Sequence, residues 1–198
     1  MKAKQALPEG YGAILSVDLQ KNKKLALWVN LLAVGIALVL AVPIHFFIPI
    51  FTLFDMSHGL GAYLLRFAVL LVGSVAYIFL HELVHGVTMK CFGTKKVKYG
   101  FTGIYAFAGS DDYYDKKSYL TIALAPVVVF FVLFAILCPL VPREWFWVVY
   151  FLQITNLSGA AGDLYVTCKF SKLPRDILVQ DSGVSMTVYS AEKPSAEE

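Results

Sequence analysis

Residues 71–90 read LVGSVAYIFLHELVHGVTMK, an apolar run that ends in two histidines and a glutamate. The run is part of a longer apolar stretch, residues 60–89. At about 1.5 Å per residue, a helix of this length exceeds a hydrocarbon layer of about 30 Å, so we expect it to cross a membrane and to tilt or protrude. Histidine and glutamate are expensive to bury in lipid and usually serve function there, so this segment also predicts where the chemistry lies.

The composition is typical of a membrane protein. Of the 198 residues, 58% are hydrophobic and only 16% are charged, and the mean hydropathy is +0.66. Soluble globular domains carry more charge on their surfaces. Three further segments are long and apolar enough to span a bilayer, namely residues 25–54, 119–141 and 145–168. We predict an all-α integral membrane protein with four transmembrane helices in a single membrane domain, residues 25–168.

The segments outside the spans contain short strand-like patterns. Between the second and third spans, residues 99–108 are rich in aromatic residues and glycine, which predicts a small cytoplasmic β-hairpin. The N-terminal segment, residues 1–24, contains an extended-looking piece at 11–19. The tail, residues 169–198, contains another at 184–189 that we expect to pack on the cytoplasmic loops, and its charged end is predicted to be disordered.

The positions of lysine and arginine predict the topology, because these residues are retained on the cytoplasmic side of a membrane. They precede the first span, separate the second from the third, and follow the fourth: Lys2, Lys4, Lys21, Lys23, Lys24, Lys90, Lys95, Lys96, Lys98, Lys116, Lys117, Lys169, Lys172, Arg175 and Lys193. The two opposite loops hold only Arg143. We therefore expect a multi-pass protein with both termini in the cytoplasm, in the plasma membrane if the source is bacterial. The net charge of +3 implies no nucleic-acid partner.

His81-Glu82-Leu83-Val84-His85 is an HExxH motif, whose chemistry requires a helix. Residues four apart share a helix face, so both imidazoles can bind one metal ion, with zinc the expected cofactor. Glu82 then lies beside the attacking water as the general base, and can pass the proton on to the leaving amine. A purely structural hydrogen-bonding role for the three side chains is the alternative.

A catalytic zinc site needs a third protein ligand, and the fourth span offers Asp163, the only acidic residue within it. His85 lies five residues before Lys90, and Asp163 lies six before Lys169. If both segments are helical, the two side chains lie roughly 7.5 and 9 Å from the same boundary, so they can meet. Asn156, about two turns earlier, is a candidate hydrogen-bond donor to the substrate carbonyl or the oxyanion. The alternative is that its side chain makes an ordinary hydrogen bond between two helices.

These two motifs resemble the site-2 protease class of intramembrane zinc metalloproteases and, more closely, a bacterial family of putative zincin peptidases. The resemblance covers residues 60–168, the expected catalytic core. It implies that His81, His85 and Asp163 bind zinc, that Glu82 is the base, and that Asn156 stabilises substrate or intermediate. The class usually shows a proline-containing Asn stretch that ends in Leu-Asp-Gly, whereas here Gly162 precedes Asp163, Leu164 follows it, and the prolines are missing.

The aromatic and glycine-rich residues 99–108 resemble the membrane-associated hairpin of the same class. That hairpin can hold an unfolded substrate segment by edge-strand pairing, and a packed cytoplasmic loop is the alternative. His45 and His58 are isolated histidines that we expect to be packing or interfacial residues. The three cysteines are scattered and show no spacing typical of a disulfide framework or a thiolate zinc site.

We therefore expect an intramembrane zinc metalloprotease that hydrolyses peptide bonds of membrane-embedded or membrane-adjacent substrates. Its expected partners are a peptide or transmembrane protein substrate and the lipid bilayer. Two alternatives stay open. One is a non-catalytic membrane zinc-binding or regulatory protein, or a pseudoprotease that binds transmembrane segments, and the other is a small transporter that uses His and Asp in a proton or metal path. Glu82 discriminates, because hydrolysis requires a base at the metal whereas binding does not.

Overall fold

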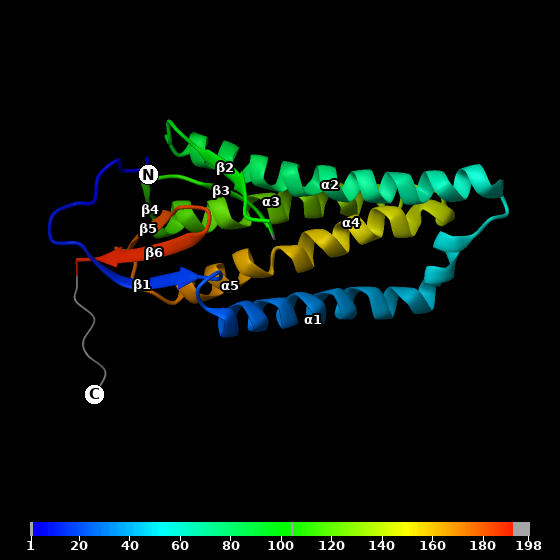
Figure 1. The fold of residues 1–198 in the computed structure, drawn as a ribbon, viewed down its shortest axis with the longest axis horizontal. Coiled ribbons are helices and arrows are strands. Elements are labelled where there is room, and N and C mark those ends of the chain that lie inside the picture. The colour runs from blue at the N-terminus through cyan, green and yellow to red at the C-terminus, as the bar shows by residue number, and fades with distance from the viewer. Residues whose placement is uncertain (1, 104, 192–198) are drawn as a thin grey trace. The chain divides into compact units, whose positions relative to one another are not determined.

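The computed structural model describes residues 2–103 and 105–191, which are mostly helical (Figure 1). Within these residues, three helices are long and apolar enough to cross a membrane: α1 (Lys23–Phe47), α2 (Gly59–Cys91) and α3 (Lys116–Leu137). They correspond to the first three predicted spans. Side-chain caps begin two of them, since the Asn22 side chain accepts the Leu25 N–H before α1, and Asp115 accepts the Ser118 N–H in α3. The predicted disordered end lies outside the described residues apart from Ala191.

The fourth predicted span is not one helix. It divides into α4 (Phe146–Gly159) and α5 (Ala161–Ser171), and the short 3-10 helix η2 (Arg143–Trp145) precedes it. Neither helix reaches the length of a span, because the 14 residues of α4 cover only about 21 Å. The break falls at Ala160, within the run of small residues Gly159-Ala160-Ala161-Gly162. Glycine has a low helix propensity, so the helix is weakest at this run.

The chain divides into two compact units. The first contains Met1–Leu27, His81–Pro126 and Asp163–Glu198, and the second contains Trp28–Leu80 and Val127–Gly162. α2 therefore contributes its motif-bearing end to the first unit and its earlier turns to the second.

The first unit contains a four-stranded antiparallel sheet that the all-α prediction lacked. Its strand order is β1-β6-β5-β4, with β1 (Gly12–Asp18), β6 (Ser185–Ser190), β5 (Leu178–Asp181) and β4 (Tyr113–Asp115). The two strand-like segments of the sequence are confirmed as β1 and β6, and they pair with each other. β4 and β5 were missed because each is only three or four residues long. The sheet joins the N-terminal segment and the tail to the start of α3.

Side chains from this sheet and three helices form the core of the first unit. Met89 comes from α2, Tyr119 and Ile122 from α3, and Val166 and Phe170 from α5, and all are at most 2% exposed. They pack with Val17, Tyr114, Ile177, Val179 and Val188. The apolar core thus binds the motif-bearing end of α2 to α5 and to the sheet.

A separate two-stranded hairpin in the same unit confirms the predicted β-hairpin. β2 (Lys98–Phe101) pairs with β3 (Ala106–Gly109) in antiparallel register, with Tyr99 opposite Ala108. The turn contains Gly103 with a φ of 90°, a conformation that favours glycine.

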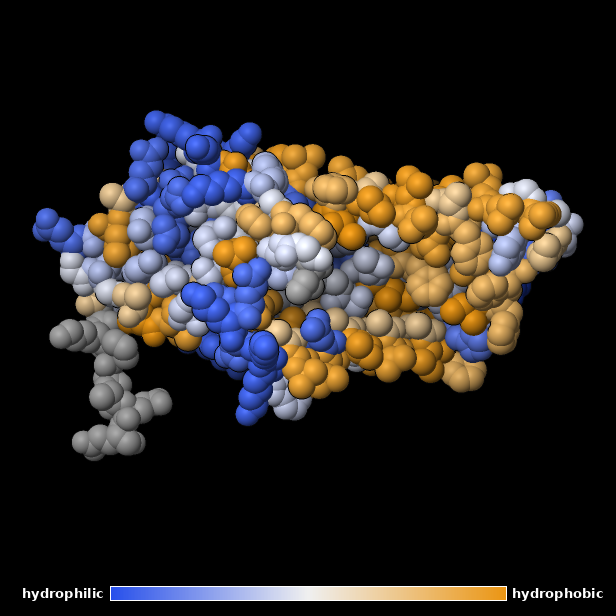
Figure 2. Space-filling view, viewed as in Figure 1, coloured by the Kyte–Doolittle hydropathy of each residue, from blue (hydrophilic) through white to orange (hydrophobic). Residues whose placement is uncertain are grey.

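The second unit is helical and apolar on its outer surface. Its core surrounds the fully buried Trp147 of α4, whose indole N–H donates to the Ile48 carbonyl at 3.0 Å. The 25 residues of α1 include one buried side chain, Val29, while Val39 and Phe46 are more than 70% exposed. Figure 2 shows hydrophobic residues over the long helices and hydrophilic residues over the strands. Lipid is the solvent that suits such a helical surface.

Candidate metal centre

The three predicted ligands lie together in the first unit. His81 and His85 are buried on α2, and their ring centroids are 4.9 Å apart. His81 Nε2 lies 3.4 Å from Oδ2 of Asp163, and His85 Nε2 lies 3.6 Å from Oδ1 of the same carboxylate. One ligand atom from each residue falls within 4.8 Å of the others. Two distant parts of the chain therefore present three donors to one point.

The spacing of these donors fits a zinc ion. Zn–N and Zn–O bonds are about 2.0–2.2 Å long, so two ligand atoms of a tetrahedral site lie about 3.4 Å apart. The two histidine–carboxylate distances, 3.4 and 3.6 Å, agree with that edge. Two imidazoles and one carboxylate are also a donor set of catalytic zinc sites, which keep the fourth position open. The residues present could thus hold zinc.

A backbone carbonyl orients His85. Its Nδ1 lies 2.9 Å from the Ile122 oxygen in α3. A carbonyl can only accept, so Nδ1 carries the proton and donates it, and Nε2 is left with its lone pair toward the Asp163 carboxylate. Metal-binding histidines commonly use their other ring nitrogen in this way, which sets the tautomer and the ring orientation.

The break in the fourth predicted span positions Asp163. Because α5 begins at Ala161, Asp163 lies in the first turn of a new helix. The peptide dipoles at a helix N-terminus favour a negative charge there. The sequence predicted Asp163 as a ligand from its depth, and the structure places it in a better electrostatic position than the interior of one long helix would offer.

Glu82 is half-buried; it directly follows His81 and precedes His85 by three residues. The backbone N–H of Ala108 in β3 donates a hydrogen bond to its carboxylate. This contact was not predictable from the sequence, because a backbone donor on a hairpin leaves no side-chain signal. It restrains the predicted base and connects it to the β2–β3 hairpin.

Asn156 lies in α4, in the second unit, and is fully buried. Its amide N–H donates to the Val127 carbonyl at 3.0 Å, and its Oδ1 accepts the Tyr77 hydroxyl at 3.0 Å. These bonds correspond to the interhelical alternative. The predicted contact between Asn156 and a substrate stays a prediction.

Asp181 is a functional candidate that sequence reasoning missed. This carboxylate at the end of β5 is 8% exposed, and it accepts the Gly183 N–H at 2.8 Å and the Tyr119 hydroxyl at 3.2 Å. Burial raises the pKa of Asp181 to about 6, and the two hydrogen bonds oppose this rise. Tyr119 precedes Ile122, the partner of His85, by three residues in α3. A single aspartate in a polar tail is expected to be exposed to solvent, so the local sequence gave no indication that Asp181 is buried.

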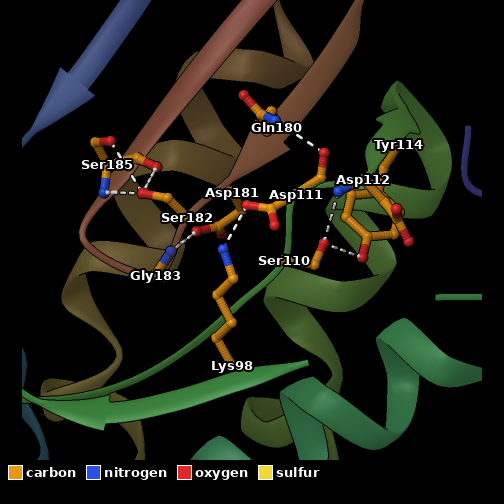
Figure 3. A network of polar contacts seen from close by, with 10 residues as sticks. All are labelled: Lys98, Ser110, Asp111, Asp112, Tyr114, Gln180, Asp181, Ser182, Gly183 and Ser185. Atoms are coloured by element: carbon orange, nitrogen blue, oxygen red, sulfur yellow. Dashed lines mark hydrogen bonds and ion pairs between the residues drawn. The ribbon is translucent and has the colours of Figure 1, made fainter. Parts of the chain in front are cut away.

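A polar network joins the hairpin to the tail around Asp181 (Figure 3). Lys98 of β2 pairs with the Asp111 carboxylate at 2.6 Å, and the Gln180 amide donates to the Asp111 carbonyl at 2.8 Å. The Ser110 N–H also donates to the Asp181 carbonyl at 2.7 Å. Ser110 and Asp111 are therefore tied to β5.

The remaining histidines and cysteines have ordinary roles. His45 accepts the Ile50 N–H at the end of α1, and His58 lies 3.9 Å from the Glu144 carboxylate. Neither belongs to a group of metal-ligating side chains in the described residues. The three cysteines are free thiols.

Comparisons with known proteins agree with this geometry. A family model described as "Putative zincin peptidase" matches residues 74–178, just over half of the chain, and this range includes the three predicted ligands and Glu82. A curated protein of Pyrococcus woesei, "Uncharacterized 24.7 kDa protein in gap 5'region", is 32% identical over 117 residues. The alignment covers 57% of this chain and 50% of the relative, so the chain spans about half the length of the curated relative it matches. No solved structure matches significantly.

Proposed function

The chain belongs to the putative zincin peptidase family, and from this membership we propose that it is an intramembrane zinc metalloprotease. It cleaves peptide bonds of membrane-embedded or membrane-adjacent substrates. The observation that carries the proposal is the approach of His81, His85 and Asp163, which offer one ligand atom each within 4.8 Å of one another.

The protein's own residues have distinct tasks in this reaction. His81, His85 and Asp163 hold the ion, and the Ile122 carbonyl orients one imidazole. When bound, zinc polarises the scissile carbonyl and lowers the pKa of the attacking water. Glu82, restrained by the Ala108 N–H, takes the proton from that water and passes it to the leaving amine. Both histidines are only 8% exposed, so their side chains are shielded from bulk solvent.

The membrane placement follows from charge and hydropathy. α1, α2 and α3 are proposed spans, and the broken segment α4–α5 is the proposed fourth crossing. An even number of crossings agrees with the lysine-rich segments, which favour a cytoplasmic position for both termini. The motif lies near the lysine-rich end of α2, because Lys90 follows His85 by five residues. We therefore place the reaction near the cytoplasmic boundary of the bilayer, where water can reach it.

Replacing Glu82 by Gln tests the proposal directly. The substitution keeps the size of the side chain and removes the base, so purified protein should retain zinc and lose cleavage of a quenched-fluorescent transmembrane peptide library in detergent micelles. Glu9→Gln makes the same chemical change at an exposed residue and should cleave at the wild-type rate. If Glu82→Gln cleaves as fast as wild type, the assigned base is wrong. Zinc binding without cleavage by wild type would support the non-catalytic alternative instead.

A further inference from the structure

Tyr99 of β2 places its hydroxyl directly against α2 at Gly86. A Cβ atom at Gly86 would lie 1.9 Å from the Tyr99 hydroxyl oxygen and 2.6 Å from the ring carbon that bears it. Both distances are far below van der Waals contact. The hydroxyl thus occupies the space that a side chain at position 86 would fill, and the close approach requires glycine there.

This position is next to the predicted catalytic groups. Gly86 directly follows His85 and lies four residues after Glu82 in the same helix. Side chains four residues apart lie on one helix face, with Cβ positions about 5–6 Å apart. The Tyr99 hydroxyl therefore stands in for a side chain on the face of α2 that carries the base.

The register of the hairpin supports the same placement independently. Tyr99 is paired with Ala108, whose N–H donates to the Glu82 carboxylate. Two paired residues of the β2–β3 hairpin thus contact α2 one turn apart, one at Glu82 and one at Gly86. Lys98, the neighbour of Tyr99, also pairs with the Asp111 carboxylate at 2.6 Å, and the β2–β3 pairing sets the register of the strand.

The hydroxyl itself is free to act. In the described part of the chain, no protein group hydrogen-bonds to it, and the side chain is 48% exposed. A phenolic hydroxyl donates one hydrogen bond, which the packing of the ring against glycine does not use. If Tyr99 only packed against Gly86, its aromatic ring would be sufficient and its hydroxyl would have no role.

We propose that Tyr99 is a further catalytic residue whose hydroxyl donates a hydrogen bond to the scissile carbonyl oxygen as that oxygen gains negative charge. The inference rests on the proposed protease function and deepens it. Tyr99 keeps its proton throughout, because Glu82 carries the proton from the water to the amine. Donors aimed at a developing oxyanion stabilise the transition state more than the ground state.

Tyr99→Phe removes the hydroxyl and keeps the ring. Removal of one such donor typically lowers kcat about 10²–10³-fold, and we expect a loss in this range with KM and zinc content unchanged. Tyr113→Phe removes a hydroxyl from β4 in the same unit and should leave kcat at the wild-type value. Equal kcat for wild type and Tyr99→Phe, with Glu82→Gln inactive, would overturn this inference and leave the proposed function intact.

Gly86→Ala gives a second, independent perturbation. The new methyl group would displace the far end of the Tyr99 side chain, so Gly86→Ala should lower kcat as Tyr99→Phe does. The kcat of the double variant Gly86→Ala/Tyr99→Phe should be at most about tenfold lower than that of the less active single variant, because both changes remove the same interaction. Full multiplication of the two losses would show that Gly86 and Tyr99 act separately and would refute the shared role.

A binding measurement does not depend on finding a good substrate. A phosphinic peptide has a tetrahedral group with a charged oxygen, which stands in for the oxyanion. Zinc-loaded wild type should bind it at least tenfold more tightly than Tyr99→Phe in isothermal titration calorimetry, while Tyr113→Phe should match wild type. Equal affinity of wild type and Tyr99→Phe would contradict the role of the hydroxyl. If wild type neither binds the phosphinic peptide nor cleaves any peptide, the proposed function fails, and this inference fails with it.

Discussion

Asp181→Asn should change how the stability of the protein depends on pH. The carboxylate of Asp181 is buried at the end of β5, and its pKa is raised to about 6, from an ordinary value of 3.8. The asparagine keeps the size of the side chain, and its carbonyl oxygen can still accept the Gly183 N–H. The variant therefore removes the titration and retains most of the local structure.

The expected size of the effect follows from the two pKa values. Well below pH 3.8, Asp181 is protonated in both the folded and the unfolded chain, so this residue imposes no penalty on folding. As the pH rises from 3.8 to about 6, the unfolded chain loses the proton while the folded chain retains it, so stability falls. Above about pH 6 both states are ionised, and stability changes no further through this residue. A difference of about two pKa units corresponds to about 3 kcal/mol. For a chain of this size, that amounts to roughly 6–12 °C in Tm.

Thermal unfolding of both proteins in detergent at pH 4 to 7 measures this effect. Relative to Asp181→Asn, wild type should lose about 2 kcal/mol between pH 4 and pH 7, because part of the full loss has already occurred at pH 4, and the steepest change should fall between pH 4 and 6. Asp176→Asn changes an exposed carboxylate of the same tail and serves as the matched control. A Tm difference between wild type and Asp181→Asn that stays constant over this range would refute the raised pKa, and with it the buried position of Asp181.

Two further predictions concern the metal and the hairpin. Asp163→Ala and His81→Ala each remove one of the three proposed donors, so the zinc content per protein after dialysis should fall well below the wild-type value. Atomic emission measures this content, and undiminished zinc in both variants would contradict the ligand assignment. Gly109→Ala would place a Cβ 2.3 Å from the backbone of Ser182, which cannot yield as a side chain can, so it should destabilise the protein by about 1–3 kcal/mol. Gly12→Ala, whose Cβ meets nothing within 4 Å, is its control, and equal Tm values for the two would contradict the contact.

The local pattern of residues was sufficient to identify much of this protein. The spacing of His81 and His85 is a property of one helix, so the motif implied that the two imidazoles share a face before any packing was known. Long apolar segments predicted α1, α2 and α3 because the length of a span is a local requirement. Asp163 was also predictable, since depth along a helix can be counted from a charged boundary.

Contacts between distant segments decided the rest, because periodicity within a segment carries no information about its partners. The four-stranded sheet arises from strands of three to seven residues, and its β1 and β6 pair across more than 160 positions of the chain. The burial of Asp181, the bond from the Ala108 N–H to Glu82, and the approach of Tyr99 to Gly86 all depend on how the hairpin and the tail pack. Local sequence therefore supplied the candidate metal ligands and the proposed base, whereas tertiary packing determined the groups that surround them.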